Sequence, residues 1–96
     1  MAREIVWTKR ASNSFRRITN YLEYEFGEKT TRNFILRTFN VIDLLKANPE
    51  MGTIESFELG IFGFLITKHN RLFYRFSQLE LILLNFFDTR SQRPKF

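Results

Sequence analysis

The hydrophobic pattern of this chain follows a helical period in its first half and a strand-like period in its second half. Apolar residues of the first half recur at intervals of three and four, at Ala11, Phe15, Ile18, Leu22 and Phe26. Such spacing is typical of an amphipathic helix with one buried side. Thr8 is a suitable N-cap residue and Gly27 a common terminator, so we expect a helix between these two residues.

A second helix is expected at residues 28–47. Its apolar side chains form two adjacent rows, Phe34, Thr38, Val41 and Leu45 in one and Ile35, Phe39 and Ile42 in the other. So broad an apolar face favours packing against both the first helix and a sheet. Asn48 precedes Pro49 and should end the helix, because the residue before proline disfavours the α region. Only Gly27 separates the two helices, so they should form an antiparallel hairpin.

The remainder of the chain predicts β-structure. Residues 5–7 are β-branched or aromatic and predict a short first strand. Four further strands are expected at residues 53–57, 61–67, 72–76 and 79–87. The order β-α-α-β-β-β-β predicts one α+β domain over residues 1–96, in which a two-helix antiparallel hairpin packs on one face of a mostly antiparallel sheet. Residues 89–96 are expected to form a polar C-terminal tail.

Composition narrows the class of protein. With 96 residues the chain suits one domain, and its twelve Phe residues can fill a dense core. It has no Cys and a single His, so no thiolate or multi-histidine metal site is available within one chain, and we expect neither a metal nor a cofactor. No apolar run approaches ~18 residues, and the first ten residues lack the apolar segment of a signal peptide. We therefore expect a cytoplasmic protein without a membrane partner.

Positive charge is concentrated in the last third of the chain. The formal net charge is +5, and residues 68–96 hold six basic side chains against two acidic ones. Lys68, His69, Arg71 and Arg75 lie in or between two predicted strands, where a hairpin turn needs only a residue such as Asn70. The asymmetry favours an anionic partner, either nucleic acid or an acidic protein segment. Simple solubility is the alternative interpretation.

Short sequence features recur in a defined order along nearly the whole chain. They are a Val-Trp strand, Ala11, Tyr21-Leu22, Phe34, Leu44-Leu45, Pro49 with Gly52, a Tyr74-Arg75 strand, and a last strand at residues 81–87 that runs into Asp88-Thr89-Arg90. In this order the chain resembles the RelE/ParE superfamily of bacterial type II toxins. The resemblance implies a small basic toxin that inhibits growth and is neutralised by a cognate antitoxin, with which it forms a hetero-oligomer.

The superfamily implies two alternative activities. The RelE branch cuts messenger RNA in the ribosome, whereas the ParE branch poisons DNA gyrase without nuclease chemistry. Cleavage of RNA by its own 2′-hydroxyl needs a base, an acid and cations that stabilise the phosphorane. Arg71 and Arg90 match arginines of the nuclease branch, and His69 could serve as acid or base because histidine titrates near neutral pH. These three residues are the catalytic candidates of that alternative.

We favour the gyrase-directed alternative, which does not require the chain to be an enzyme. The nuclease branch usually carries a tyrosine near its C-terminus, where this chain has Phe96, which lacks a hydroxyl group. The expected target-binding residues are Lys68, Arg71, Arg75, Arg90 and Arg93, with Arg71 and Arg90 first. Ion pairs of Arg75 or Arg90 with Glu80 or Asp88 are the structural alternative.

An antitoxin surface is expected where the sheet is left uncovered. Phe86 and Phe87 are adjacent, so on a regular strand one of them must face away from the helices. The expected antitoxin-binding residues are Phe62, Phe64, Phe86, Phe87 and Arg75, against a partner segment with acidic and apolar side chains. Burial of both phenylalanines in the core is the alternative. A second alternative function is a basic RNA-binding domain in which Phe73, Tyr74 and Phe76 stack on bases.

Overall fold

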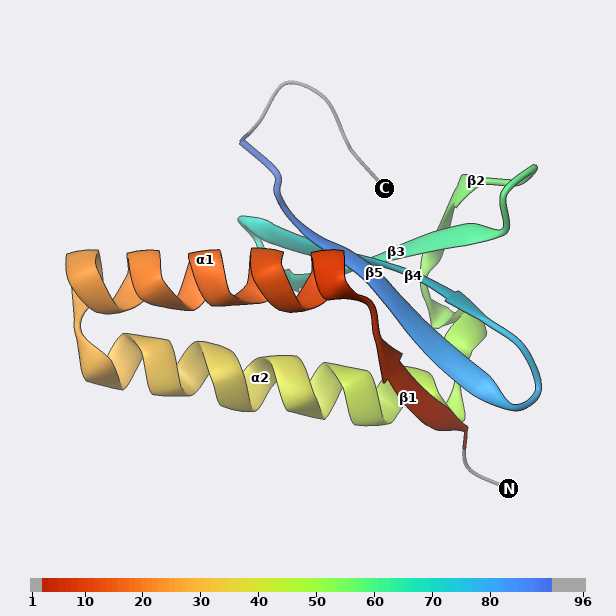
Figure 1. The fold of residues 1–96 in the computed structure, drawn as a ribbon, viewed down its shortest axis with the longest axis horizontal. Coiled ribbons are helices and arrows are strands. Elements are labelled where there is room, and N and C mark those ends of the chain that lie inside the picture. The colour runs from red at the N-terminus through yellow and green to blue at the C-terminus, as the bar shows by residue number, and fades with distance from the viewer. Residues whose placement is uncertain (1–2, 91–96) are drawn as a thin grey trace.

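The computed structural model describes residues 3–90 and shows a helical hairpin packed against a five-stranded sheet (Figure 1). The elements in chain order are β1 (Glu4–Trp7), α1 (Lys9–Phe26), α2 (Glu28–Ala47), the short 3-10 helix η1 (Pro49–Met51), β2 (Thr53–Ser56), β3 (Ile61–Thr67), β4 (Asn70–Phe76) and β5 (Glu80–Asp88). The α+β fold expected from the sequence is confirmed. The sequence did not predict η1, and it placed the strand boundaries within two residues.

The ends of the two helices follow from their capping residues. The Thr8 hydroxyl accepts a hydrogen bond from the Ala11 N–H at 3.1 Å, as expected of an N-cap. Gly27 has a φ of 91°, a backbone conformation that favours glycine. Its N–H donates to the carbonyls of Leu22 and Glu23, and its own carbonyl accepts from the Thr31 N–H. One residue therefore ends α1 and begins α2.

The sheet has the strand order β1-β5-β4-β3-β2. Strand β1 pairs in parallel with β5, from Glu4 opposite Glu80 to Trp7 opposite Leu83, whereas the other pairs are antiparallel. The register of β4 and β5 shifts beside Phe73, so the strands carry a bulge there. Beyond Leu83, strand β5 no longer has β1 as a neighbour, and α1 takes its place.

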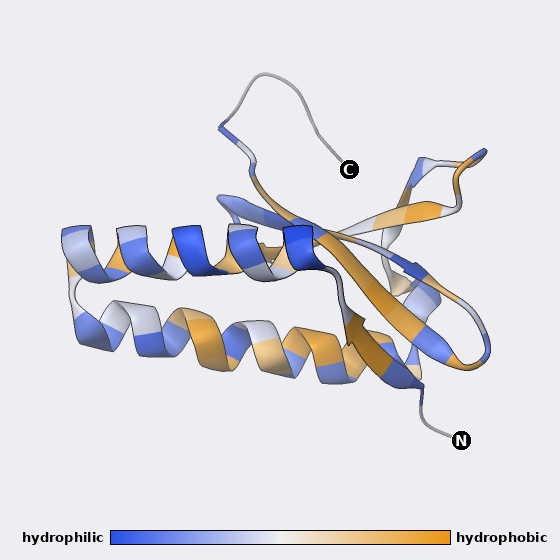
Figure 2. Ribbon diagram, in the orientation of Figure 1, coloured by the Kyte–Doolittle hydropathy of each residue, from blue (hydrophilic) through white to orange (hydrophobic). Residues whose placement is uncertain are grey.

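The core lies between the helical hairpin and one face of the sheet. Its buried residues are Ala11, Phe34, Ile42, Leu45, Ile66, Leu72, Tyr74, Leu81, Leu83 and Phe86. Figure 2 shows hydrophobic residues concentrated along β1 and β5, while much of α1 is hydrophilic. Phe86 is only 4% exposed, and its ring packs against those of Trp7 and Phe15.

Two buried hydroxyl groups connect the layers. The Ser14 hydroxyl on α1 donates to the Ala11 carbonyl and accepts from the Phe86 N–H of β5 at 2.9 Å. The Tyr74 hydroxyl donates to the Pro49 carbonyl at 2.6 Å and accepts from the Gly52 N–H at 3.1 Å. Burial raises the pKa of Tyr74 to about 12, because the charged phenolate would lose its hydration. These bonds fix α1 and η1 to the sheet.

Among the described residues, neither helix has the length and apolar character needed to cross a membrane. Within the same residues, no three His, Asp or Glu side chains are grouped closely enough to hold a metal ion.

Candidate functional site

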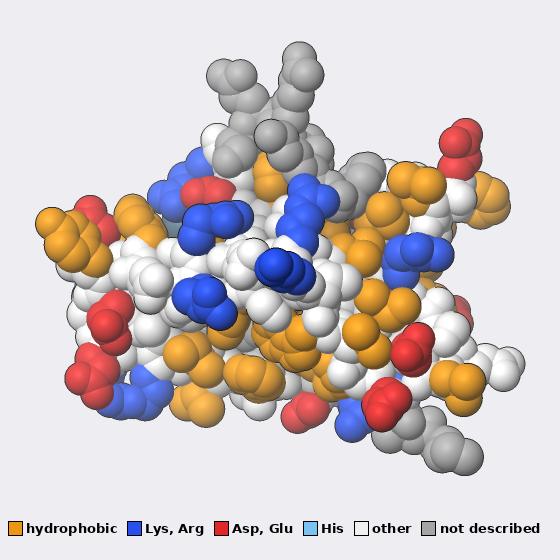
Figure 3. All heavy atoms as spheres, in the orientation of Figure 1, with side chains coloured by type: hydrophobic (Ala, Val, Ile, Leu, Met, Phe, Trp, Pro, Cys, Tyr) orange, Lys and Arg blue, Asp and Glu red, His pale blue; other side chains and the backbone are white. Residues whose placement is uncertain are grey.

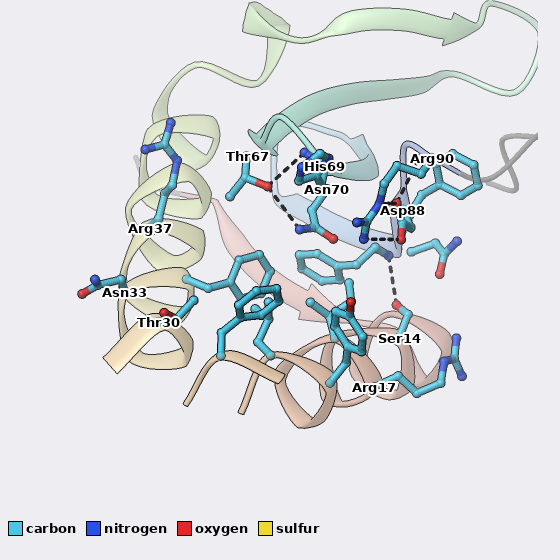
Figure 4. Close-up of a pocket in the computed structure, with 18 of the residues that line it drawn as sticks. Ser14, Arg17, Thr30, Asn33, Arg37, Thr67, His69, Asn70, Asp88 and Arg90 are labelled. Atoms are coloured by element: carbon cyan, nitrogen blue, oxygen red, sulfur yellow. Dashed lines mark hydrogen bonds and ion pairs between the residues drawn. The ribbon is translucent and has the colours of Figure 1, made fainter. Parts of the chain in front are cut away.

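A groove of about 1240 Å³ opens between the helical hairpin and the ends of β3, β4 and β5 (Figure 4). We call it the basic groove. Its cationic lining residues are Arg10, Arg17, Arg37 and Arg90. Its apolar lining residues are Ile18, Leu22, Phe26, Phe34, Phe86 and Phe87. The combination of arginines and apolar side chains suits a ligand that is both acidic and hydrophobic.

The groove exists because the hairpin is longer than the part of it that the sheet covers. Figure 1 shows the joined ends of α1 and α2 extending beyond the strands. Phe26 belongs to the apolar face of α1 predicted from the sequence, yet its side chain is 61% exposed. Tyr21 is 47% exposed and packs edge-on against Phe26. The end of the hairpin thus carries aromatic surface that no described part of the chain covers.

The negative charge in the groove lining is already paired. Arg90 Nε lies 3.0 Å from Asp88 Oδ1, and Arg90 Nη2 lies 2.9 Å from Asp88 Oδ2. Hydrogen bonding to this guanidinium holds the pKa of Asp88 below its ordinary value. The side chains of Arg90 and Asp88 are 56% and 41% exposed, so a competing anion can reach them. Among the described residues, the groove lining holds four arginines and one carboxylate, so its formal charge is positive.

Lys68 and His69 form the β3–β4 turn, and only His69 of the two is in the groove lining. The Thr67 hydroxyl accepts from the His69 N–H and from Asn70 Nδ2, which orders the turn. Thr89, just after β5, donates from its N–H to the His69 carbonyl and from its hydroxyl to the Lys68 carbonyl. His69 is half-buried and lines the groove, whereas Lys68 is exposed.

Arg71 lies on the opposite face of the sheet. It pairs with Leu65 and Phe87 in the strand register, and alternation separates it from Leu72, which is in the core. Its Nη1 atom lies 3.0 Å from Glu55 Oε2, and the two side chains are only 27% and 21% exposed. Arg71 is therefore held in a largely buried ion pair that joins β4 to β2.

Sequence reasoning did not single out Glu55. It lies sixteen residues before Arg71, and β3 runs between their strands, so no local pattern joins them. Gly63 of β3 leaves the room for the pair, because a Cβ there would lie 2.5 Å from Glu55 Oε2. A glycine inside a predicted strand was the one available signal of a close approach.

Two of the three catalytic candidates of the nuclease alternative line one groove, and the third does not. His69 and Arg90 line the basic groove, whereas Arg71 does not line it and is paired with Glu55 on the other face. Arg75 is exposed on the face that carries Arg71, beside a second pocket of about 290 Å³. Arg93 lies outside the described residues.

The expected antitoxin-binding phenylalanines fall into two groups. Phe62 and Phe64 are partly buried and pack against the core, and Phe86 is part of it. Phe87 is half-buried, lines the groove and packs against Phe73 with ring centroids 5.7 Å apart. Phe86 thus lies in the core, whereas Phe87 is partly accessible in the groove. Contact of these phenylalanines with an antitoxin stays a prediction.

Comparisons with solved structures agree on the fold. The chain is similar to a structure described as the chromosomal ParDE TA system from P. aeruginosa, with a TM-score of 0.74 and 12% identity over 91% of this chain and 96% of that one. It is also similar to the YoeB/ParE toxin from Agrobacterium tumefaciens, with a TM-score of 0.63 and 16% identity over 88% and 97%. The YoeB dimer from Staphylococcus aureus gives a TM-score of 0.67 at 11% identity over 95% and 100%.

Sequence comparison supplies the family. A search of curated protein sequences finds no match to the chain. The family described as ParE toxin of type II toxin-antitoxin system, parDE, matches residues 5–93, which is nearly the whole chain. This chain therefore belongs to the ParE toxin family of type II toxin–antitoxin systems.

Proposed function

We propose that this toxin arrests growth by acting on DNA gyrase, without nuclease chemistry, and that a cognate antitoxin neutralises it through the basic groove. The observation that carries the antitoxin site is the groove lining, in which arginines and apolar side chains occur together and the one carboxylate among the described residues is paired. An antitoxin segment with alternating acidic and apolar residues matches both properties.

Backbone contacts favour a helical segment over an added strand. Strand β5 lacks a strand neighbour beyond Leu83, so its edge could in principle accept one. At that edge, however, the Phe86 N–H is already bonded to Ser14. An amphipathic helix does not need free backbone groups, since its apolar stripe packs against the groove and its acidic residues meet the arginines.

The gyrase assignment is supported by family membership and by the ion pair that holds Arg71 outside the groove lined by His69 and Arg90. A ribonuclease needs its base, acid and phosphate-binding cations around one scissile bond. His69 lines the basic groove, whereas Arg71 does not line it and is paired with Glu55. A gyrase poison needs a recognition surface instead, and Lys68, Arg75 and Arg90 are exposed to supply one.

The antitoxin site is tested by charge reversal in the groove. We expect Arg17→Glu and Arg90→Glu each to weaken the complex with the cognate antitoxin by tenfold or more, measured by isothermal titration calorimetry. Lys29→Glu changes the charge equally at an exposed position outside the groove lining, and should leave the affinity within about twofold. Equal weakening by all three variants would show that net charge, not the groove, determines binding.

The target is tested by pulse labelling after the toxin is induced without its antitoxin. An early fall in thymidine incorporation with intact amino-acid incorporation is the result expected of a gyrase poison. Purified toxin should also inhibit supercoiling by purified gyrase. If amino-acid incorporation falls first and supercoiling is unaffected, the gyrase assignment is wrong and the ribosome-dependent alternative replaces it.

A further inference from the structure

The solvent-facing side of the first half of α1 carries only cationic and amide side chains. The exposed residues between positions 9 and 20 are Lys9, Arg10, Asn13, Arg16, Arg17 and Asn20. At 3.6 residues per turn they fall within about 120° of the helix circumference, so they form one continuous stripe. We call this stripe the α1 basic face. Figure 3 shows Lys and Arg side chains gathered over α1.

The order of charges along α1 opposes helix stability. A helix favours acidic side chains at its N-terminus and basic ones at its C-terminus. The first turn of α1 has no acidic residue and begins with Lys9 and Arg10, while the last turn has no basic residue and contains Glu23 and Glu25. Charges of this order lower the stability of the helix at both of its ends. Such a departure from the stabilising arrangement is expected where the residues serve to bind a partner.

The composition of the stripe distinguishes between classes of partner. Protein interfaces generally have an apolar centre, but the α1 basic face includes no apolar residue. Lys, Arg and Asn are side chains that commonly contact phosphate groups of nucleic acids. Non-specific binding of single strands usually adds aromatic stacking platforms, and none lies within the stripe. Tyr24 is 89% exposed one turn later, but it stands between Glu23 and Glu25.

We propose that the α1 basic face binds the sugar–phosphate backbone of duplex DNA without reading its sequence. The face is about 17 Å long, and a duplex carries one negative charge per ~1.7 Å of its axis, so its cations can each reach a phosphate. This inference rests on the proposed action on gyrase and extends it: the toxin contacts the DNA that gyrase holds as well as the enzyme. Lys9 and Arg16 do not line the basic groove, so DNA contact can be tested separately from antitoxin binding.

The test measures binding of the full-length toxin to a fluorescein-labelled 20-base-pair duplex, by anisotropy between 50 and 200 mM NaCl. If all four cations contact phosphates, the slope of log affinity against log salt should be about −3.6. Lys9→Ala/Arg16→Ala should make that slope shallower by about 1.8 and should weaken binding at 50 mM NaCl roughly tenfold.

The matched control is Lys29→Ala/Arg32→Ala, which removes two exposed charges from α2 and leaves the α1 basic face intact. Its slope should stay within about 0.5 of the original. Lys9→Arg/Arg16→Lys keeps the charge and should keep the affinity. Circular dichroism confirms that each variant is folded.

Three outcomes would overturn the inference. They are no measurable binding at 50 mM NaCl, equal loss in the α1 variant and the α2 control, and tighter binding of a 20-nucleotide single-stranded RNA than of the duplex. A supercoiling assay run in parallel separates this result from the target assignment. Gyrase inhibition that persists without DNA binding removes only the DNA contact, whereas DNA binding without gyrase inhibition removes only the gyrase assignment.

Discussion

Two arginine–carboxylate pairs occupy opposite sides of the sheet, and they differ in almost every physical respect. Arg90 and Asp88 are two residues apart, with half of each side chain in solvent. Arg71 and Glu55 are sixteen residues apart, join β4 to β2 across β3, and are about three-quarters buried. The first pair lies in the basic groove, and the second lies on the sheet face that carries no helices.

The sequence analysis treated Arg71 and Arg90 alike, but their different burial gives them different physical roles. An exposed pair contributes little to stability and exchanges readily with another anion. A largely buried pair is harder to replace, because removal of one partner leaves a poorly hydrated charge. We therefore expect the β2 side of the molecule to respond to mutation through stability, and the groove side through binding.

The largest expected effect is at Gly52, on the β2 side. A Cβ at this position would lie 2.3 Å from the Tyr74 hydroxyl and 2.7 Å from the Gly63 carbonyl, so backbone must move. Gly52→Ala should lower the free energy of unfolding by roughly 2–4 kcal/mol. Urea denaturation measures this loss. Gly60→Ala is a control in which the new Cβ meets nothing within 4 Å, although its positive φ adds some strain.

Tyr74→Phe should have the next largest effect on stability. It removes the bonds to the Pro49 carbonyl and the Gly52 N–H, and we expect a loss of about 1–3 kcal/mol in the same urea assay. Tyr74 is fully buried, and Phe keeps its aromatic ring in place. The change in the free energy of unfolding therefore reports the hydroxyl group alone. A loss below about 0.5 kcal/mol would mean that η1 is not held by this hydroxyl.

The same tyrosine predicts a pH dependence. Its pKa is about 12 in the folded chain against 10.0 as the reference, so the unfolded chain releases this proton first as the pH rises. The stabilisation is complete below pH 10 and is lost between pH 10 and about 12. Urea midpoints over this range should fall more steeply in the original chain than in Tyr74→Phe. Parallel curves would contradict the raised pKa.

The smallest stability effects compare the two arginines directly. Arg71→Ala leaves the largely buried Glu55 carboxylate without its partner and should lower the free energy of unfolding by about 1 kcal/mol in thermal or urea denaturation. Arg90→Ala should leave the unfolding midpoint unchanged, because Asp88 is well hydrated, while it weakens antitoxin binding. The reverse ranking in stability would show that the groove pair, and not the β2 pair, supports the fold.

The sequence predicted local elements well and distant relationships poorly. Capping residues and period gave both helices, since Thr8, Gly27 and Asn48 act through their immediate neighbours. The pairing of β1 with β5 joins Glu4 to Glu80, which no local pattern indicates. Periodicity also placed Phe26 on a buried face, because a helical pattern does not reveal where the sheet beneath the helix ends.

The residues of the candidate site were also predicted only in part from the sequence. Basic residues after residue 67 were expected to act at one functional edge, but His69 of the β3–β4 turn lines the groove, while Arg71 of β4 is held outside its lining by the ion pair with Glu55. The helical side of the groove, with Arg10, Arg17 and Arg37, was not expected, because those positions read from the sequence as solvated helix surface. Only the fold brings them opposite Arg90.

The shared glycine between the helices has a consequence for association kinetics. Gly27 serves both helices at once and leaves no flexible linker, while Ser14 anchors α1 to β5. The two walls of the groove cannot spread apart without breaking these bonds. For the antitoxin site proposed above, the groove would be a preformed receptor, and the conformational change on binding would fall on the incoming segment. Mutations that preorganise that segment as a helix should accelerate capture, whereas loosening the toxin should not.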